Sequence, residues 1–272
     1  MRIFLIHLLL FLSVFNFSLA AQEEDDEEEK PKTFFGGINV GAFFANSNTA
    51  IIYTGGNVIT PYGINYILTQ PHNKITFDNY FKHPYWVADL PQNPVYKTAF
   101  DIGFHGGFHI NKVSTIYIDI NITQLKYEQT FSIAIDDPSN QSPEPTYEQI
   151  PIFGKEKRFN VNLGTQLSYY TTEKTDLYWA VFGNLNVVNM ERNYFVINNT
   201  EYEIYHNPPD QINVKPGGLG YGGGTGLGLK YQLTDNIVLD FTYNLYYTKI
   251  NMTDNIQPYG MHHGLLMRIL WN

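Results

Sequence analysis

Three glycines in this 272-residue sequence have a spacing that could bind a nucleotide. Gly218, Gly220 and Gly223 match the GxGxxG pattern of a dinucleotide-binding loop. That motif needs a strand, a tight turn and the start of a helix, whereas here glycine continues to alternate with larger residues as far as Tyr231. We therefore interpret the match as accidental and expect no cofactor.

Two histidine pairs could suggest a metal site. His105 and His109 lie four residues apart, a spacing that on a helix would bring both side chains to one zinc ion. On a strand the same spacing separates them by about 13 Å along one face, and His262 and His263 would point to opposite faces. Cysteine is absent, which excludes thiolate ligands as well as disulfides. We expect no metal site.

Long alternating segments must position these residues. Between Val95 and Ile133, large apolar residues alternate with small or polar ones on both sides of a turn at Asn111–Ser114. This period of two predicts a pair of antiparallel strands. Arms of this length exceed the roughly five or six residues of an ordinary strand and are typical of tilted strands that cross a bilayer.

The N-terminal residues indicate export. Residues 1–20 combine Arg2, an apolar run and the small residues Ser18 and Ala20, as in a secretory signal peptide cleaved after Ala20. A membrane anchor is the alternative, but the apolar run is shorter than the about 20 residues a span requires. Residues 21–32 predict a disordered, solvated acidic tail, with calcium capture or a sorting signal as functional alternatives. The residues after this tail do not carry the excess of Lys and Arg that nucleic-acid binding needs, so we expect no nucleic-acid partner.

The same alternation recurs along residues 33–272 and predicts eight strands. The other six are expected at 33–45, 154–170, 176–197, 217–233, 237–250 and 262–272. Short turns alternate strictly with long connections, which begin at Asn46, Asp136, Asn198 and Met252. This layout predicts an all-β fold, an eight-stranded antiparallel transmembrane β-barrel with short periplasmic turns and long extracellular loops.

The export signal, the eight long strands and the aromatic near the C-terminus resemble the small outer-membrane β-barrel proteins of Gram-negative bacteria, of the OmpA, OmpX and OmpW type. The abundance of Tyr and Asn is similar to Bacteroidota members, although no motif identifies a subfamily. The resemblance implies an outer-membrane location, contact with membrane lipid and a periplasmic N-terminus. It also implies that Trp271, which precedes Asn272, is the signal that the barrel-assembly machinery recognises.

Charged residues on the inward register are expected to meet inside the barrel. The apolar register must face lipid, because unpaired polar groups are costly in hydrocarbon. His105, Asp119, Asp240 and Arg268 then fall at similar depth, with Lys230 at the margin. We predict a buried ionic cluster in which Arg268 bridges Asp240 and Asp119, since buried charges must be paired; a gate or proton site is the functional alternative. Eight strands leave room only for side chains, which argues against a diffusion pore.

The connection at residues 46–94 is the longest and is rich in aromatic residues, so we expect a folded extracellular cap with a short helix or hairpin near Ile64–Leu68. Binding tends to reside on loops held by a rigid scaffold. We expect a non-enzymatic scaffold whose loops bind a partner or a glycan. The candidate binding residues are Tyr62, Tyr66, Tyr80, Phe81, Tyr85 and Trp86.

Three other functions fit the predicted barrel less well. A subunit of a larger envelope complex, such as a secretion or barrel-insertion complex, would carry an outward patch poor in polar residues beyond the membrane band. A small transporter of apolar compounds, similar to the OmpW-like branch, would need a lateral opening and an apolar lumen, which the polar inward register opposes. A lipid-modifying barrel enzyme would need serine and histidine together on the lipid face, where His263 has no evident serine partner.

Overall fold

A computed structural model describes residues 34–271 except 57–58, 141–142 and 212–213. The predicted signal peptide (1–20), the acidic tail (21–32) and Asn272 lie outside the described residues. No helix in the described part is long and apolar enough to cross a membrane.

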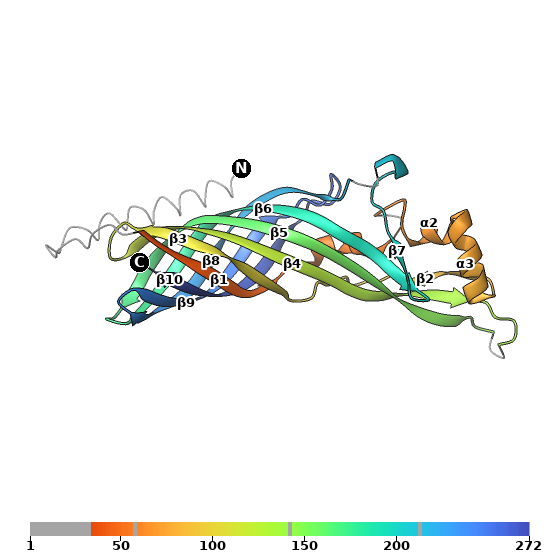
Figure 1. The fold of residues 1–272 in the computed structure, drawn as a ribbon, viewed down its shortest axis with the longest axis horizontal. Coiled ribbons are helices and arrows are strands. Elements are labelled where there is room, and N and C mark those ends of the chain that lie inside the picture. Colours follow the sequence, from red (N-terminus) through yellow and green to blue (C-terminus); the bar gives the residue numbers. More distant parts are fainter. Residues whose placement is uncertain (1–33, 57–58, 141–142, 212–213, 272) are drawn as a thin grey trace. The chain divides into compact units, whose positions relative to one another are not determined.

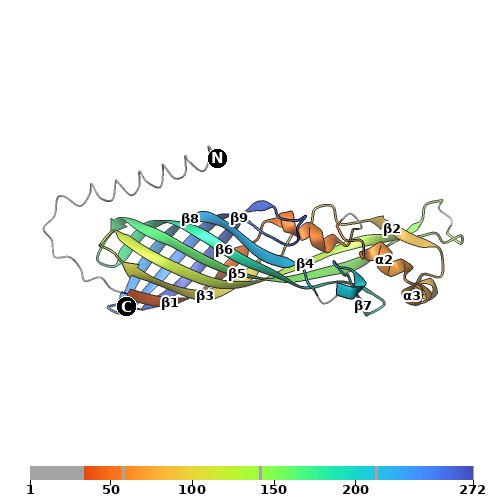
Figure 2. The ribbon, with the colours of Figure 1, turned by 90° about the horizontal axis from the view of Figure 1, so that it is seen from above.

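Eight antiparallel strands of the described chain close into a ring (Figures 1 and 2). They are β1 (Phe34–Phe44), β3 (Ala99–His109), β4 (Ser114–Ile135), β5 (Thr146–Thr171), β6 (Thr175–Ile197), β8 (Gly217–Thr234), β9 (Ile237–Lys249) and β10 (Tyr259–Trp271). Each pairs with the next along the chain, and β10 pairs back onto β1, with Ile269 opposite Ile38. The predicted eight-stranded antiparallel barrel is confirmed.

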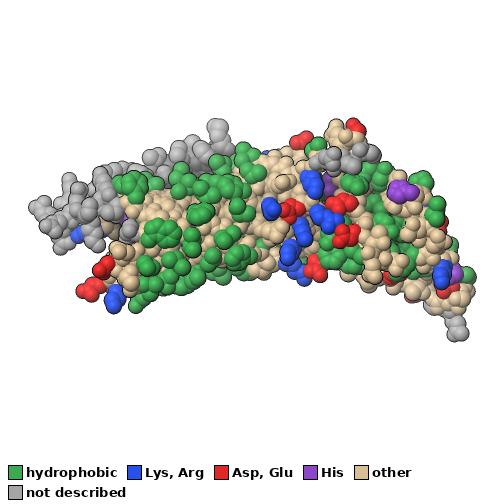
Figure 3. All heavy atoms as spheres, in the orientation of Figure 1, with side chains coloured by type: hydrophobic (Ala, Val, Ile, Leu, Met, Phe, Trp, Pro, Cys, Tyr) green, Lys and Arg blue, Asp and Glu red, His purple; other side chains and the backbone are tan. Residues whose placement is uncertain are grey.

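The two faces of each barrel strand separate as the alternation predicts. On β3, Phe100 and Phe104 are exposed, while Asp101 and His105 are buried. Figure 3 shows apolar side chains gathered over the barrel strands on the face that it presents. Local turn chemistry fixes the register of the first hairpin, because the Asn111 side-chain oxygen accepts hydrogen bonds from the backbone N–H groups of Val113 and Ser114.

Residues 47–89, which we call the cap, fold beyond the barrel on the rim that carries the long loops. The cap contains the 3₁₀ helix η1 (Ser47–Thr54), α2 (Ile64–Thr69), α3 (Pro71–Phe81) and β2 (Tyr85–Asp89). Strand β2 pairs with the far end of β4, and the short β7 (Thr200–Glu203) pairs with β6; a one-turn 3₁₀ helix, η2 (Pro209–Gln211), follows β7.

The cap has its own apolar core. Ile52, Ile67 and Phe77 pack with Phe131 of β4 and Phe195 of β6, and all five are buried. The expectation of a helix near Ile64–Leu68 corresponds to α2, but the sequence pattern did not indicate η1, α3 or β2. These elements form because the inward face of the overlong strands continues as an apolar surface that must be covered.

Two predicted loops contain strand structure instead. The connection expected at 136–153 ends earlier, because β5 begins at Thr146 and passes through Pro151. Proline lacks the N–H that a central strand donates, and pairing of β5 with β6 in fact begins only at Ile152. The connection expected from Asn198 opens with the β6–β7 hairpin, whose Asn198 and Asn199 both have the positive φ that a tight hairpin turn requires.

Candidate functional site

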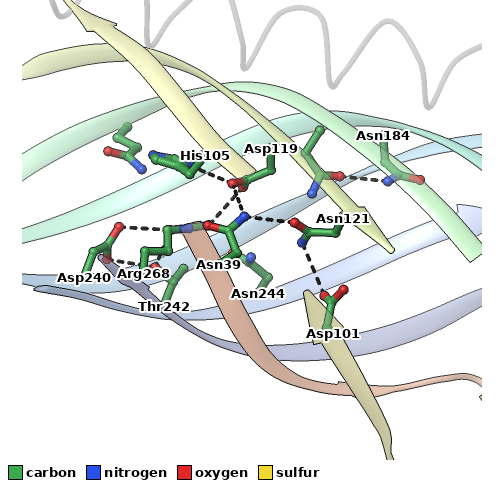
Figure 4. Close-up of polar contacts among 12 residues, drawn as sticks. Asn39, Asp101, His105, Asp119, Asn121, Asn184, Asp240, Thr242, Asn244 and Arg268 are labelled. Atoms are coloured by element: carbon green, nitrogen blue, oxygen red, sulfur yellow. Dashed lines mark hydrogen bonds and ion pairs between the residues drawn. The ribbon is translucent and has the colours of Figure 1, made fainter. Parts of the chain in front are cut away.

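The predicted ionic residues meet inside the barrel (Figure 4). One terminal nitrogen of the Arg268 guanidinium lies 2.9 Å from an Asp119 carboxylate oxygen, and the other lies 3.0 Å from an Asp240 carboxylate oxygen. The His105 ring contacts the second Asp119 oxygen at 2.6 Å. All four side chains are buried, so the charges have protein partners in place of water.

Neutral donors complete this cluster. The Tyr178 hydroxyl donates to Asp240 at 2.7 Å, and Asn39 donates to Asp119 at 3.0 Å. Lys230 lies at the margin, where its ammonium donates to the Gln166 side-chain oxygen at 2.6 Å and stands over the Tyr178 ring. These charges have hydrogen-bond or ionic partners within the lumen, so the cluster is explained by stabilisation of the barrel interior.

The glycines of β8 make room for aromatic side chains from β6. A Cβ atom on Gly228 would overlap the Tyr178 ring, and one on Gly224 would overlap the Phe182 ring. The GxGxxG match lies within barrel strand β8, without the turn and helix start that a dinucleotide-binding loop needs. The space that glycine leaves is occupied by Tyr178 and Phe182, which further fills the lumen.

A second buried ion pair lies where the barrel meets the cap. The Arg158 guanidinium donates to Glu156 at 2.6 Å, and both side chains are completely buried. The hydroxyls of Tyr53, from η1, and Tyr96 donate to the same carboxylate at 2.8 and 2.9 Å. The sequence pattern placed Arg158 on the inward register, but it gave no indication that the cap would supply a tyrosine.

The outward face carries a band of exposed apolar residues. On β5 the band runs from Phe159 to Tyr169, followed beyond Phe159 by Lys157. Ten residues of strand tilted near 45° span about 24 Å, close to the roughly 25 Å apolar band of a membrane barrel. A soluble surface rarely exposes so large an apolar patch, so the barrel is the membrane-spanning part of the protein.

A pocket opens in the cap between the α2–α3 pair and β7. It has a volume of about 350 Å³. Four tyrosines, three amide side chains, two glutamates, one histidine and one isoleucine line it: Tyr62, Tyr66, Tyr202, Tyr205, Gln70, Asn73, Asn207, Glu201, Glu203, His72 and Ile67. Five of its eleven lining residues come from the connection after β6, which the sequence pattern did not associate with the cap.

Backbone and ring contacts hold the pocket walls together. The backbones of Tyr62 and Tyr205 form a β-bridge, and the Thr60 hydroxyl donates to the Tyr205 carbonyl at 2.6 Å. The Tyr62 and Tyr66 rings meet edge to face at 5.1 Å. Behind the pocket, the Tyr202 ring contacts the Phe77 ring at 4.8 Å. The two walls are therefore fixed relative to one another.

One arginine pairs with both glutamates of the pocket. Arg192 donates to Glu201 at 2.8 Å and to Glu203 at 3.0 Å. The hydrogen bond to Glu201, followed by that to Glu203, raises the pKa of Arg192 above its ordinary value. Nearby, burial lowers the pKa of His206 to about 4, so this ring is neutral near pH 7. The carboxylates remain available as acceptors without making the pocket strongly anionic.

The other predicted binding residues lie elsewhere. Phe81 is buried in the cap core, and the half-buried Tyr85 packs against it with ring centroids 4.6 Å apart. Neither residue lines the pocket. Tyr80 donates to Glu148 at 2.8 Å, and this bond raises the Tyr80 pKa. Trp86 is exposed on β2 and does not line the pocket.

The remaining candidates from the sequence also have defined places. The His263 ring contacts the Tyr243 hydroxyl on the lipid-facing side. Within the described residues, no group of three or more His, Cys, Asp or Glu side chains could hold a metal ion. Trp271 is exposed at the last residue of β10, where it lies opposite Gly36 of β1.

No family model and no curated protein matches this sequence. Among solved structures, it is similar to Neisserial surface protein A, with 11% identity, a TM-score of 0.41, and coverage of 90% of this chain and 99% of that one. It is also similar to the attachment invasion locus protein Ail of Yersinia pestis (12% identity, 87% and 96% coverage, TM-score 0.30). The outer-membrane protein OprG of Pseudomonas aeruginosa is another (7% identity, 88% and 93% coverage, TM-score 0.35). At these TM-scores the likenesses say nothing about ligand or activity.

Proposed function

We propose that this protein is an outer-membrane barrel that presents its cap to the outside of a Gram-negative cell, and that the cap pocket binds a neutral saccharide. The pocket itself carries the proposal. At about 350 Å³ it lies within the roughly 300–1,000 Å³ range of small-molecule sites. Its two walls come from parts of the chain more than a hundred residues apart.

The lining chemistry supports a sugar. Tyrosine rings offer flat apolar faces to the C–H face of a pyranose and a polar edge to its hydroxyls. The amides of Gln70 and Asn207 and the carboxylates of Glu201 and Glu203 can pair with vicinal hydroxyls. Arg192 pairs with both glutamates and leaves one net negative charge, so an acidic sugar would be repelled here, whereas an uncharged sugar would not.

The filled lumen supports a function outside the barrel rather than through it. Transport of apolar compounds would require an apolar path, but the interior holds the Arg268 cluster at one level and the Glu156–Arg158 pair at another. On this proposal the protein is not an enzyme. The barrel anchors the cap, its N-terminus is periplasmic, and Trp271 serves the barrel-assembly machinery during insertion.

Binding to an array of immobilised glycans tests the proposal. The full mature protein, labelled and folded in detergent, is expected to bind a subset of neutral glycans. Tyr62→Ala and Tyr205→Ala should each weaken binding by about tenfold, the size of one lost aromatic contact. Tyr147→Ala is the matched control, because Tyr147 is an exposed tyrosine of β5 that does not line the pocket. Equal binding by all three variants, or no saccharide binding by the wild type, would refute the proposal.

A further inference from the structure

One carboxylate inside the described barrel, that of Asp101, has no cation beside it. The buried charged side chains are four carboxylates and two arginines: Asp101, Asp119, Glu156, Asp240, Arg158 and Arg268. The other three carboxylates are paired with the arginines at 2.6 to 3.0 Å. Asp101 is only 2% exposed and forms no ion pair within the described residues.

The other ionisable groups of the lumen do not compensate Asp101. The His105 ring contacts Asp119, so a proton on that ring would add to the cations around Asp119 and leave Asp101 unchanged. Lys230 lies directly opposite Asp240 on the neighbouring strand. The lumen therefore contains a carboxylate in excess at the level of Asp101.

Only neutral groups donate hydrogen bonds to Asp101. The Thr123 hydroxyl donates at 2.9 Å and the Asn121 amide nitrogen at 3.3 Å. Neutral donors reduce the cost of burying a carboxylate but do not remove its charge, and buried charges in proteins are paired or coordinate metal ions. Asp101 therefore requires either a proton or a bound cation.

Amide and hydroxyl oxygens lie close to this carboxylate. Asn121 joins Asp101 to Asn39, because its nitrogen donates to the carboxylate and its oxygen accepts from the Asn39 nitrogen at 2.9 Å (Figure 4). The Tyr246 hydroxyl is near enough to interact electrostatically with Asp101, and the Asn244 nitrogen contacts that hydroxyl at 3.4 Å. These oxygens come from four strands around the lumen.

Two of the amide oxygens have no hydrogen-bond donor. In the described chain, the side-chain oxygens of Asn39 and Asn244 are unpaired, although both residues are at most 1% exposed. Buried polar atoms in native structures are nearly always paired. A proton on Asp101 could be donated to one neighbour only, so at least one of these oxygens would keep no partner.

The ligand types indicate which cation fits. Carboxylate and amide oxygens are the ligands of hard cations. One carboxylate balances one positive charge, and the described residues lack the group of His, Cys, Asp or Glu side chains that a transition metal needs. A singly charged alkali ion matches this set of oxygens.

We propose that the barrel lumen binds one Na⁺ or K⁺ ion between the Asp101 carboxylate and the side-chain oxygens of Asn39 and Asn244. The ion neutralises the excess charge and gives both amide oxygens a partner. This inference depends on the membrane-spanning barrel and not on the cap pocket, so the two proposals fail separately.

Urea unfolding of the full mature protein in detergent tests this site. The protein is folded and then unfolded at mildly alkaline pH in NaCl, in KCl, or in N-methylglucamine chloride of equal ionic strength, because the organic cation is too large for the lumen. The wild-type midpoint should be higher by about 0.5 M urea or more in at least one alkali salt, as expected when an ion binds only the folded state. The difference between NaCl and KCl identifies the preferred ion.

Three variants locate the effect. Asp101→Asn keeps the shape and removes the charge, so its midpoint should be the same in all three salts and above that of the wild type in N-methylglucamine. Asn244→Ala should raise the alkali-ion concentration needed for half of the stabilisation by about tenfold, the effect of losing one hydrogen-bonding ligand to a charge. Asp235→Asn makes the same chemical change at an exposed turn residue and should keep the full salt dependence.

Crystals of the wild type grown with rubidium or thallium(I) in place of K⁺ give a direct readout. An anomalous peak beside the Asp101 carboxylate is expected, and a map without one overturns the proposal. Equal wild-type midpoints in the three salts would do the same, as would an alkali-ion effect that survives in Asp101→Asn. A midpoint that rises on acidification but ignores Na⁺ and K⁺ would show that Asp101 carries a proton instead.

Discussion

Replacing Arg268 with leucine removes the cation between two buried carboxylates. Removing one partner of a buried ion pair costs about 3–5 kcal/mol, because the remaining charge has no compensation. Asp119 would keep its contacts with His105 and Asn39, and Asp240 would keep the Tyr178 hydroxyl. We therefore expect a loss near the middle of that range, about 4 kcal/mol, rather than two full penalties.

Urea unfolding of the folded barrel in detergent measures this loss, followed by heat-modified gel mobility and tryptophan fluorescence. With a slope of about 2 kcal/mol per molar urea, the midpoint should fall by about 2 M. A triple variant, Arg268→Leu with Asp119→Asn and Asp240→Asn, replaces the charges together and should recover most of the stability. A single variant that unfolds at the wild-type midpoint would show that the cluster does not stabilise the barrel.

Three further outcomes are expected from the packing of the lumen and the cap. Gly228→Ala should greatly reduce the yield of folded barrel, because the new methyl group would overlap the Tyr178 ring. Phe77→Ala should destabilise the cap core by about 3–5 kcal/mol, so that limited proteolysis cuts the cap while the barrel keeps its folded gel mobility. His206→Gln should make the thermal stability of the protein less dependent on pH between about 6.5 and 4. The depressed pKa of the wild-type ring contributes stability that is fully present above pH 6.5 and is lost as the pH falls toward 4. The loss is at most about 3 kcal/mol, and it is smaller than this because the ring is partly exposed.

Each of these has a control and a contradicting result. Gly183→Ala adds the same methyl group on the lipid-facing side of β6, where it meets almost nothing, so equal folding of both alanine variants would contradict the packing of the lumen. For Phe77→Ala, simultaneous proteolysis of cap and barrel would show that the two do not unfold separately. For His206, superimposable pH profiles of variant and wild type would mean that this ring does not titrate with unfolding.

The barrel was predictable from the sequence because its signal is local. Phe100, Ile102 and Phe104 alternate with inward residues, and one such alternation repeated in eight arms specifies faces, turns and closure. The approach of Arg268 to Asp119 followed from counting residues along strands of known rise, even though the pair is 149 residues apart. Because the rise per residue of a strand is nearly constant, the depth of a side chain in the barrel can be counted from the nearest turn.

The cap was not predictable in the same way. Helix α3 contains no long apolar repeat, and its buried residues are only Phe77 and Phe81, so its structure depends on the strand extensions that cover it. The β6–β7 hairpin could have been recognised from Asn198–Asn199, which is a hairpin turn signal. These residues were instead assigned to the long connection expected from Asn198. The pocket combines Tyr66 with Tyr205, and no spacing within either segment indicates the other.

The distribution of charge then explains why a closed barrel can still have a function. Inside, each carboxylate of the Arg268 cluster has a cation or hydroxyl partner, so these charges are committed to stability. Outside, the cap pocket leaves tyrosine rings and amides at the surface. Unused binding capacity for organic ligands therefore lies above the apolar band. Ligands that approach along the membrane surface or from the medium can reach it without passing through the barrel.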